Sequence, residues 1–549
     1  YILRQRHVRA EAAFQGQEGQ FGAKTAGGFE ARCDEGAIMT MMRGVFTVGF
    51  WTLVSRVMGF LRDVLIAGAL GASPVAEAFF LAFSLPNLFR RFFAEGAFNI
   101  AFVPMFSKKL ATGDAPLAFA RDALSMLALV LIVLNALAMF AMPYLVWAMA
   151  SGFAGDARFD LTVLFGRIAF PYILFISLAA LISGVLNSAE RFVAAAAAPV
   201  LLNICFILAL FAAQWLGWDI GLTLAWSVPL AGIAQLGVLW VAALRAGFRL
   251  LPRWPVMTPE LKRLAIIAAP AAMAGGVVQV NLLVGRQIAS YFEGANAWLY
   301  YADRLYQLPL GVVGVAIGIV LLPDLSRRLR SGDDAGGERA FNRAAELSLL
   351  LTIPCTVALV VIPSALVTVL FERGAFVASD TQATALATAI YGLGLPAFVL
   401  QKLYQPVFFA REDTRSPFNY ALVALAVNAA VAIGLSRYIG FTAAAYGATC
   451  AGWAMLACLW WGARRFGPAA SWDAQLRKRS FRILLASLGM GVVVWITARA
   501  LEPVLQMDGL RLLGLVVILL VAVGSYALAG RFLGAFNFAE LRQMIRRSD

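Results

Sequence analysis

Charged side chains inside otherwise apolar segments are the residues of this sequence best suited to bind a ligand. The stretch 84–110, SLPNLFRRFFAEGAFNIAFVPMFSKKL, is apolar enough to lie in a bilayer, yet it carries Arg90, Arg91 and Glu95. A charge at the centre of a membrane-spanning helix costs roughly 2.5–3.5 kcal/mol on insertion scales. Each of these side chains therefore requires a partner charge, a wet cavity or a charged ligand.

More charges lie in other apolar segments. Arg56 and Asp63 are seven residues apart and share a helix face, and Arg91 can pair with Glu95 at i,i+4, whereas Arg90 has no local partner. Structural ion pairs of this kind, with Arg62 and Lys402 snorkelling to the interface, are one explanation. The full set is Arg56, Arg62, Asp63, Glu77, Arg90, Arg91, Glu95, Arg286, Asp303, Arg304 and Lys402.

Arginines outnumber carboxylates in the middle of these segments. Guanidinium groups bind phosphate and carboxylate oxygens through paired hydrogen bonds. The excess therefore favours an anionic substrate that bears phosphate or carboxylate over ion pairs alone.

Composition places these charges in a helical membrane protein. The chain has 549 residues, 61% of them hydrophobic and 14% charged, with a mean hydropathy of +0.79. Soluble proteins carry about 25% charged residues, and barrel strands are only about 10 residues long. A single histidine and five scattered cysteines exclude Ser-His-Asp catalysis and zinc sites, and there is no phosphate-binding G-x-x-x-x-G-K-[ST] loop.

We predict about 14 membrane spans, because a helix needs about 20 apolar residues to cross the hydrocarbon core. Lysine and arginine gather in every second loop, as in Lys108 and Lys109 or Arg327 and Arg328, whereas the opposite loops are nearly bare, with Arg158 the exception. This asymmetry predicts cytoplasmic termini and accounts for the net charge of +14 without nucleic acid. The predicted spans are 45–70, 75–107, 118–149, 160–187, 192–215, 220–244, 261–291, 295–325, 341–371, 381–409, 416–438, 441–463, 481–500 and 510–533.

An internal repeat divides the spans. PMFSKKLATGD at 104–114 matches PDLSRRLRSGD at 323–333, and Asn203 matches Asn428 at nearly the same offset. We therefore expect an N-lobe at 42–250 and a C-lobe at 251–466, each of six parallel-repeat helices, as in transporters that handle substrate between two lobes. Residues 467–549 add two helices and a tail. Residues 1–41 are polar and glycine-rich, and we expect a disordered tail or an extension upstream of a natural start near Met41 or Met42.

Several motifs together resemble one family. SRVMGFLRD at 55–63, LPNLFRRFFAEGAFNIAFVP at 85–104, FPYILFISL at 170–178 and YYADRLYQLPLGVVGVAIG at 300–318 are similar to the MurJ (MviN) lipid II flippases of the MOP exporter superfamily. The resemblance runs from about Met42 to the last span. It implies a flippase, not an enzyme, that moves undecaprenyl-pyrophosphate-disaccharide-pentapeptide from the cytoplasmic to the periplasmic leaflet of the bacterial inner membrane. It also implies a central cationic cavity and a groove for the lipid tail formed by the two extra helices.

The resemblance assigns roles to individual residues. Arg62, Arg90 and Arg304 would bind the pyrophosphate and Arg56 would add cavity charge, with Asn87 and Asp303 as their neighbours. Glu77 would be a gate residue at the periplasmic side. Asp63, Arg91, Glu95, Arg286 and Lys402 are the remaining gating or supporting candidates.

The sequence departs from the family pattern in two places. Gln307 stands where relatives often have an acid, and no Asp or Glu lies between Leu261 and Phe292, where some relatives bind sodium, so membrane potential is the favoured driving force over a monovalent ion. No cofactor or metal is expected. Lipid II and the membrane are the expected partners, with the cell-wall synthesis machinery as a further candidate, and the chain is expected to be monomeric.

Three alternatives remain open from the residues themselves. A flippase for another polyprenyl-pyrophosphate oligosaccharide would use the same phosphate chemistry. A MATE-type antiporter for organic cations should carry intramembrane carboxylates instead of an excess of arginine. A membrane-embedded enzyme such as a glycosyltransferase needs a carboxylate cluster for a metal or a base.

Overall fold

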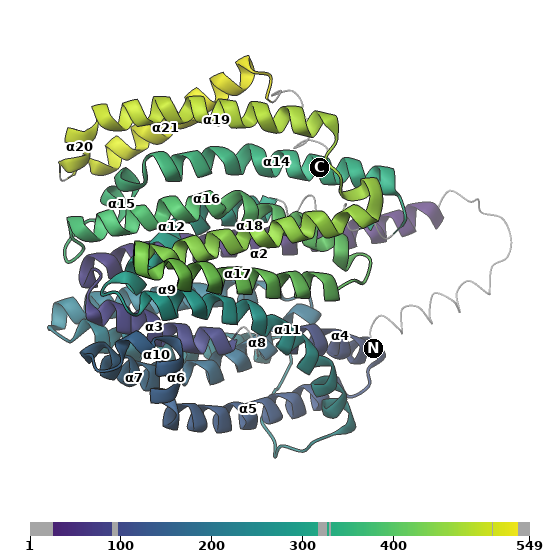
Figure 1. Cartoon of the computed structure of the whole chain (residues 1–549). Helices are drawn as coiled ribbons and strands as arrows, with labels where there is room; N and C mark the ends of the chain where they lie inside the picture. Colours follow the sequence, from purple (N-terminus) through teal and green to yellow (C-terminus); the bar gives the residue numbers. More distant parts are fainter. Residues whose placement is uncertain (1–25, 91–96, 317–326, 329–330, 508, 536–549) are drawn as a thin grey trace.

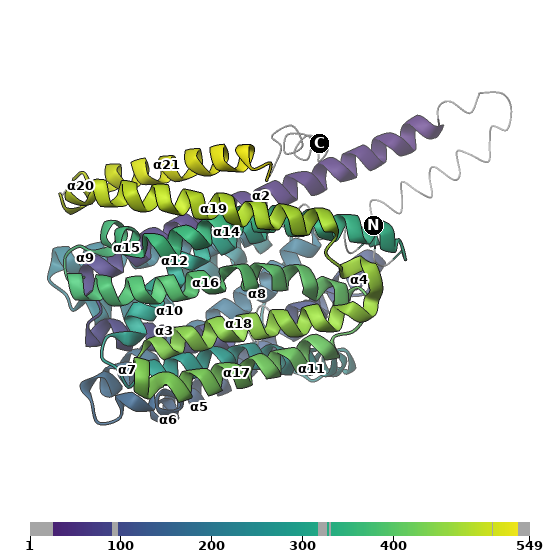
Figure 2. The same cartoon turned by 45° about the horizontal axis from the view of Figure 1, so that its top comes forward.

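The computed structural model describes residues 26–90, 97–316, 327–328, 331–507 and 509–535, and throughout these ranges every regular element is a helix (Figure 1). The first half comprises α2 (Ala26–Leu70), α3 (Pro74–Arg90), α4 (Ala97–Thr112), α5 (Pro116–Phe140), α6 (Met142–Met149), η2 (Ser151–Phe153), α7 (Ala157–Ala169), α8 (Tyr172–Ser188), α9 (Phe192–Leu216) and α10 (Ile220–Arg245). Helix α2 begins well before the predicted first span, and its N-terminal end projects past the other helices in Figure 2.

The second half follows a short non-helical connection. It comprises α11 (Pro259–Ala289), α12 (Ala295–Ala316), α14 (Asp334–Val361), α15 (Pro363–Phe371), α16 (Ala378–Phe409), α17 (Arg415–Ile439), α18 (Thr442–Ala463) and η4 (Arg464–Ala470). Three further helices complete the chain: α19 (Ala474–Ala500), α20 (Glu502–Gln506) and α21 (Arg511–Phe532). Helix α19 packs on α14 and on α21. The pair α19 and α21 lies along the outer side of the second half (Figure 1).

Two predicted spans are divided by proline. Within 118–149, α5 ends at Phe140 and α6 carries Pro143 in its first turn; within 341–371, α14 ends at Val361 and α15 starts at Pro363. Proline lacks a backbone N–H and fits the first turn of a helix, so it starts a new helix more readily than it continues one. These breaks lie at corresponding positions in the two halves.

The expectation of an all-helical polytopic membrane protein is confirmed. Among the described residues, 10 helical segments are long and apolar enough to cross a membrane, and they correspond to the third to sixth and the ninth to fourteenth predicted spans. The other four predicted spans contain α2, α3 with α4, α11 and α12. These four hold all of the charged candidates except Lys402, and the total of 14 remains a prediction.

Equivalent helices pack together in both halves. Helix α9 packs on α2 and α10, as α17 packs on α11 and α18; likewise α8 packs on α5 and α10, as α16 packs on α14 and α18. The repeat extends to an ion pair. Lys109 Nζ lies 2.9 Å from Asp114 Oδ2, and Arg328 Nη1 lies 3.3 Å from Asp333 Oδ2 at the matching positions of the two repeated motifs.

The end of α2 lies directly against the second half. The amide of Ala375 donates to the Gly68 carbonyl at 2.9 Å, and Tyr301 Oη donates to the Gly71 carbonyl at 2.9 Å. Gly71 has a positive φ of 59°, and a Cβ there would clash with the carbonyl oxygen of Ala375. Backbone therefore meets backbone between the halves, which only a glycine permits.

Gly71→Ala should force the two halves apart at this end. We expect it to lower the free energy of unfolding by about 1–3 kcal/mol more than backbone strain alone, because the clashing atom is fixed backbone. Gly217→Ala is the matched control, since Gly217 has a φ of 68° and no atom within 4 Å of its added Cβ. Thermal unfolding of the purified protein in detergent measures both variants, and equal melting temperatures would contradict the close approach.

Candidate functional site

Asp63 is the centre of a buried charged cluster between the two halves. The carboxylate is 1% exposed and its neighbour Arg62 6% exposed. Arg62 donates to Asp63 Oδ1 from Nε at 2.9 Å and from Nη2 at 2.7 Å. From α12, Arg304 Nε lies 3.0 Å from Asp63 Oδ2. One carboxylate therefore pairs with two arginines that come from different halves of the chain.

Two uncharged polar residues complete the cluster. Tyr300 Oη donates to Asp63 Oδ1 at 3.2 Å and accepts from Arg304 Nη2 at 3.0 Å. Asn203 on α9 accepts from Arg62 Nη1 at 3.0 Å and donates to the Ser55 carbonyl at 3.0 Å. The Asn203 contacts tie Arg62 to the first half, whereas Tyr300 links Asp63 of the first half to Arg304 of the second.

Aromatic rings support the same cluster from the sides. The Tyr300 ring stacks on Phe80 of α3 with centroids 3.8 Å apart. The Arg62 guanidinium lies 5.2 Å from the Phe206 ring centroid, and that of Arg304 lies 4.6 Å from the Tyr300 centroid. Rings at these distances attract guanidinium groups and exclude water from their faces.

The ion pair between Arg56 and Asp63 that the seven-residue spacing allowed is replaced by the pairs described above. Arg56 instead packs against Gly311 of α12, where an added Cβ would overlap its guanidinium. Lys402 Nζ lies 3.0 Å from where a Cβ on Gly314 would be. Two glycines on α12 thus let a cation from α2 and a cation from α16 approach the same helix.

Asp303 lies in a separate polar group within the second half. It accepts hydrogen bonds from Gln307 and Tyr306, and Arg304 and Arg286 are its nearby cations. Gln307, which stands where relatives often have an acid, is here a donor to Asp303. Asp303 therefore has hydrogen-bond partners of its own, and Arg304 is the cation that it has in common with Asp63.

The candidates of the second predicted span lie near the end of α3. Arg90 is the last residue of that helix and is half-buried. Asn87 donates to the Phe83 carbonyl one turn earlier, at 2.9 Å. Arg91 and Glu95 lie outside the described residues, so their pairing stays a prediction.

Glu77 joins the two halves at the end of the bundle where α2 ends. Its carboxylate is 0% exposed. It accepts from Arg158 Nη1 at 3.0 Å and from the backbone amides of Gly294 and Asn296 at 2.9 and 3.0 Å. Gly294 directly precedes α12 and Asn296 lies in its first turn, so Glu77 of one half caps a helix of the other.

A second polar contact joins the halves at the same end. The amide of Ser151 donates to Gln287 Oε1 at 3.1 Å, and the amide of Gly152 donates to Ser290 Oγ at 3.0 Å. An added Cβ on Gly152 would lie 2.6 Å from the Ser290 backbone carbon. The halves are therefore in close polar contact around the C-terminus of α11 and the N-terminus of α12.

At the other end of the bundle, the last turn of α4 meets the first turn of α11 through a more exposed ion pair. Lys109 Nζ lies 2.7 Å from Glu260 Oε1 and 2.9 Å from Asp114 Oδ2. Hydrogen bonds to Glu260 and Asp114 raise the pKa of Lys109. Exposed pairs contribute little stability because water screens them.

Sequence reasoning placed Arg62, Asp63 and Arg304 among the candidates, and these three do come together. It missed the roles of Tyr300, Asn203 and Arg158. Tyr300 precedes Arg304 by four residues and so shares its helix face, which is a usable signal. Asn203 and Arg158 contact partners far away in sequence. No group of three or more His, Cys, Asp or Glu side chains that could hold a metal ion occurs in the part of the chain that the structure describes.

The fold is one that transporters of known structure share. The structure is similar to an inward-facing multidrug resistance MATE family transporter of the MOP superfamily, with a TM-score of 0.65 at 13% identity over 76% of this chain and 95% of that one. It is also similar to a structure of the lipid II flippase MurJ in an inward closed conformation, with a TM-score of 0.73 at 24% identity over 88% and 99% of the two chains.

Sequence comparison identifies the family. The model of the lipid II flippase MurJ family matches residues 66–513. A probable lipid II flippase MurJ of Rhizobium tropici is 44% identical over 93% of this chain and 97% of its own length, and the lipid II flippase MurJ of Burkholderia cenocepacia is 38% identical over 73% and 78%. The chain belongs to the MurJ family of lipid II flippases, as the motifs predicted. It is a multi-pass inner-membrane protein of a transporter family, not an enzyme.

Glu77→Gln should loosen the contact between the halves. The amide NH2 group of glutamine cannot accept from the three donors that Glu77 satisfies, so at least one donor is left unpaired. We expect a cysteine placed at Asn296, which is 9% exposed, to react faster with a membrane-impermeant maleimide in the Glu77→Gln background. Asp160→Asn, on an exposed position of α7, is the control and should leave the labelling rate unchanged.

Proposed function

We propose that this protein flips lipid II, the undecaprenyl-pyrophosphate-linked disaccharide-pentapeptide, from the cytoplasmic to the periplasmic leaflet by alternating access. The observation that carries this proposal is the convergence of Arg62 and Arg304 from two halves on one buried carboxylate. A cation pair of this kind suits an anionic headgroup that binds between the lobes. Arg56 of α2 and Lys402 of α16 add two more cations, which pack against α12 further along that helix. Flipping makes and breaks no covalent bond.

In this proposal Asp63 holds the place of the substrate phosphate. One of its oxygens accepts from Arg62 and the other forms an ion pair with Arg304, as two phosphate oxygens would, since a guanidinium group binds carboxylate and phosphate with similar geometry. A pyrophosphate carries more negative charge than a carboxylate, so it competes effectively for the same donors. Exchange of Asp63 for the ligand would release the bridge that Asp63 makes between α2 and α12.

The exchange links binding to the movement of the lobes. A ligand shifts a conformational equilibrium only by its difference in affinity for the two states. Arginines from both lobes supply that difference, because both can reach one ligand only when the lobes are close. In this scheme Arg90 also binds the pyrophosphate, and Glu77 and Arg158 form the gate that must open toward the periplasm.

The membrane potential is the proposed driving force. Moving one elementary charge across 100 mV is worth about 2.3 kcal/mol, and an anion moves outward down that potential. With cytoplasmic termini, as the loop charges predict, the end of the bundle at Glu77 faces the periplasm and the end at Lys109 and Glu260 faces the cytoplasm.

Arg62→Ala and Arg304→Ala should each abolish growth in a strain depleted of its own flippase. We expect lipid II to accumulate in the inner leaflet, because the pyrophosphate loses one of the three arginines that bind it in this scheme. Arg437→Ala is the matched control, since Arg437 is exposed in the last turn of α17. Immunoblots must show equal protein levels. Normal growth and a normal lipid II distribution in both variants would rule out the cavity role.

Asp63→Asn should make the site more responsive to added anion. Without the Asp63 carboxylate, Arg62 and Arg304 repel each other, and breaking a buried ion pair costs roughly 3–5 kcal/mol. We expect the melting temperature to fall, and inorganic pyrophosphate to restore more of it than in the unmodified protein. Asp122→Asn removes a similarly buried carboxylate paired with Arg253 and should gain nothing from pyrophosphate. An equal response in both variants would contradict the exchange.

A further inference from the structure

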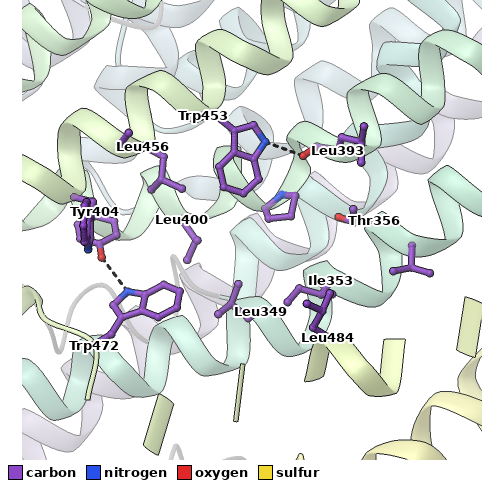
Figure 3. A pocket seen from close by; sticks show the side chains of 14 residues that line it. Leu349, Ile353, Thr356, Leu393, Leu400, Tyr404, Trp453, Leu456, Trp472 and Leu484 are labelled. Carbon is purple, nitrogen blue, oxygen red and sulfur yellow. Dashed lines mark hydrogen bonds between the residues drawn. The ribbon is translucent and has the colours of Figure 1, made fainter. Parts of the chain in front are cut away.

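An apolar pocket lies between α14, α16, α18 and α19, away from the charged cluster. Its volume is about 670 Å³, within the roughly 300–1,000 Å³ typical of ligand pockets. Figure 3 shows side chains from these helices facing one another across it, among them Leu349, Leu400, Leu456 and Trp453. None of the lining residues comes from α2, α3 or α12.

The pocket is open to the hydrocarbon of the membrane. All four helices are among the segments apolar and long enough to span it. Several lining side chains are exposed, including Leu393, Trp453 and Leu484. A pocket lined by apolar side chains of such helices accepts apolar chains more readily than polar, water-soluble molecules.

Two of the three lining tryptophans already have a hydrogen-bond partner for their indole N–H. Trp453 Nε1 donates to the Leu393 carbonyl at 3.0 Å, and Trp472 Nε1 donates to Tyr404 Oη at 2.9 Å, as the dashed lines in Figure 3 mark. The indole rings therefore present apolar surface to the pocket. The ligand must match that surface with a flexible apolar chain.

Basic side chains stand at one end of the pocket. The Arg464 guanidinium lies 3.8 Å from the ring centroid of the lining residue Trp460, and Arg477 donates to the carbonyl of the lining residue Trp472 at 3.0 and 3.1 Å. Both arginines are exposed, as is Lys478. These cations suit the phosphate of a lipid whose chain enters the pocket beside them.

We propose that this pocket binds one acyl chain of an anionic glycerophospholipid of the leaflet on the side of Arg464 and Arg477. The headgroup lies on these two arginines, and the chain fills the space between α18 and α19. The occupant differs from the flipped substrate, because the cations that its headgroup meets belong to η4 and α19 and not to the cluster around Asp63.

Native mass spectrometry of the full-length protein in detergent tests the site. Phosphatidylglycerol and phosphatidylethanolamine are added separately to delipidated protein, and bound copies are counted. Ala457→Phe fills the pocket from its lining. Arg464→Gln with Arg477→Gln alters only exposed side chains and so leaves folding intact. Val423→Phe, on the exposed face of α17, is the control for added aromatic bulk.

We expect Ala457→Phe to lose one bound copy of either lipid, while Val423→Phe loses none. The double arginine variant should keep the copy but lower the preference for phosphatidylglycerol over phosphatidylethanolamine by about tenfold. Equal binding by all variants would overturn the pocket as a lipid site. Displacement of phosphatidylglycerol by an equimolar amount of undecaprenyl phosphate, abolished by Ala457→Phe, would overturn the phospholipid as its occupant.

Discussion

The pairing of one buried carboxylate with two arginines sets the geometry on which the rest of the structure depends. In a low-dielectric interior an unpaired charge is costly, and removing one partner of a buried pair leaves that cost uncompensated. Asp63 therefore fixes α2 beside α12, because Arg304 has to reach across from the second half. Tyr300, Asn203 and the rings of Phe80 and Phe206 hold both arginines in that position.

The two ends of the bundle are held together by contacts of different character. At the end of α2, buried hydrogen bonds from Glu77 and close backbone contact at Gly71 join the halves. At the opposite end, Lys109 reaches Glu260 by an ion pair whose carboxylate is largely solvated. Buried polar contacts are costly to leave unmade, whereas exposed ion pairs separate readily. Breaking the contacts at the second end therefore costs less free energy than breaking those at Glu77 and Gly71.

The sequence predicted the class of fold, the repeat and the three charged residues of the cluster, Arg62, Asp63 and Arg304. These depend on local apolar runs and on motif spacing. It did not predict which residues pair. Spacing along one helix placed Arg56 with Asp63, but Asp63 pairs with its neighbour Arg62 and with Arg304 of α12, and packing between helices decided the second pair. Glu77 was expected at a gate, but the sequence did not predict its donors. These are Arg158 and two backbone amides at the start of α12, and they depend on how the halves meet. Such contacts are long-range and have no signature in a single segment.

The repeat also shows how the two halves differ in the way they position their cations. Asn203 of α9 and Asn428 of α17 are repeat equivalents, and each donates to a backbone carbonyl on the first helix of its own half, at Ser55 and at Asn281. This shared contact packs equivalent helices in both halves. Only Asn203 also accepts from an arginine, because α2 carries Arg62 where it faces α9. Asn428 instead meets the side chain of Asn281. A common helix-packing contact has thus been extended in the first half to position a cation, and the second half supplies its own cation, Arg304, from a different helix.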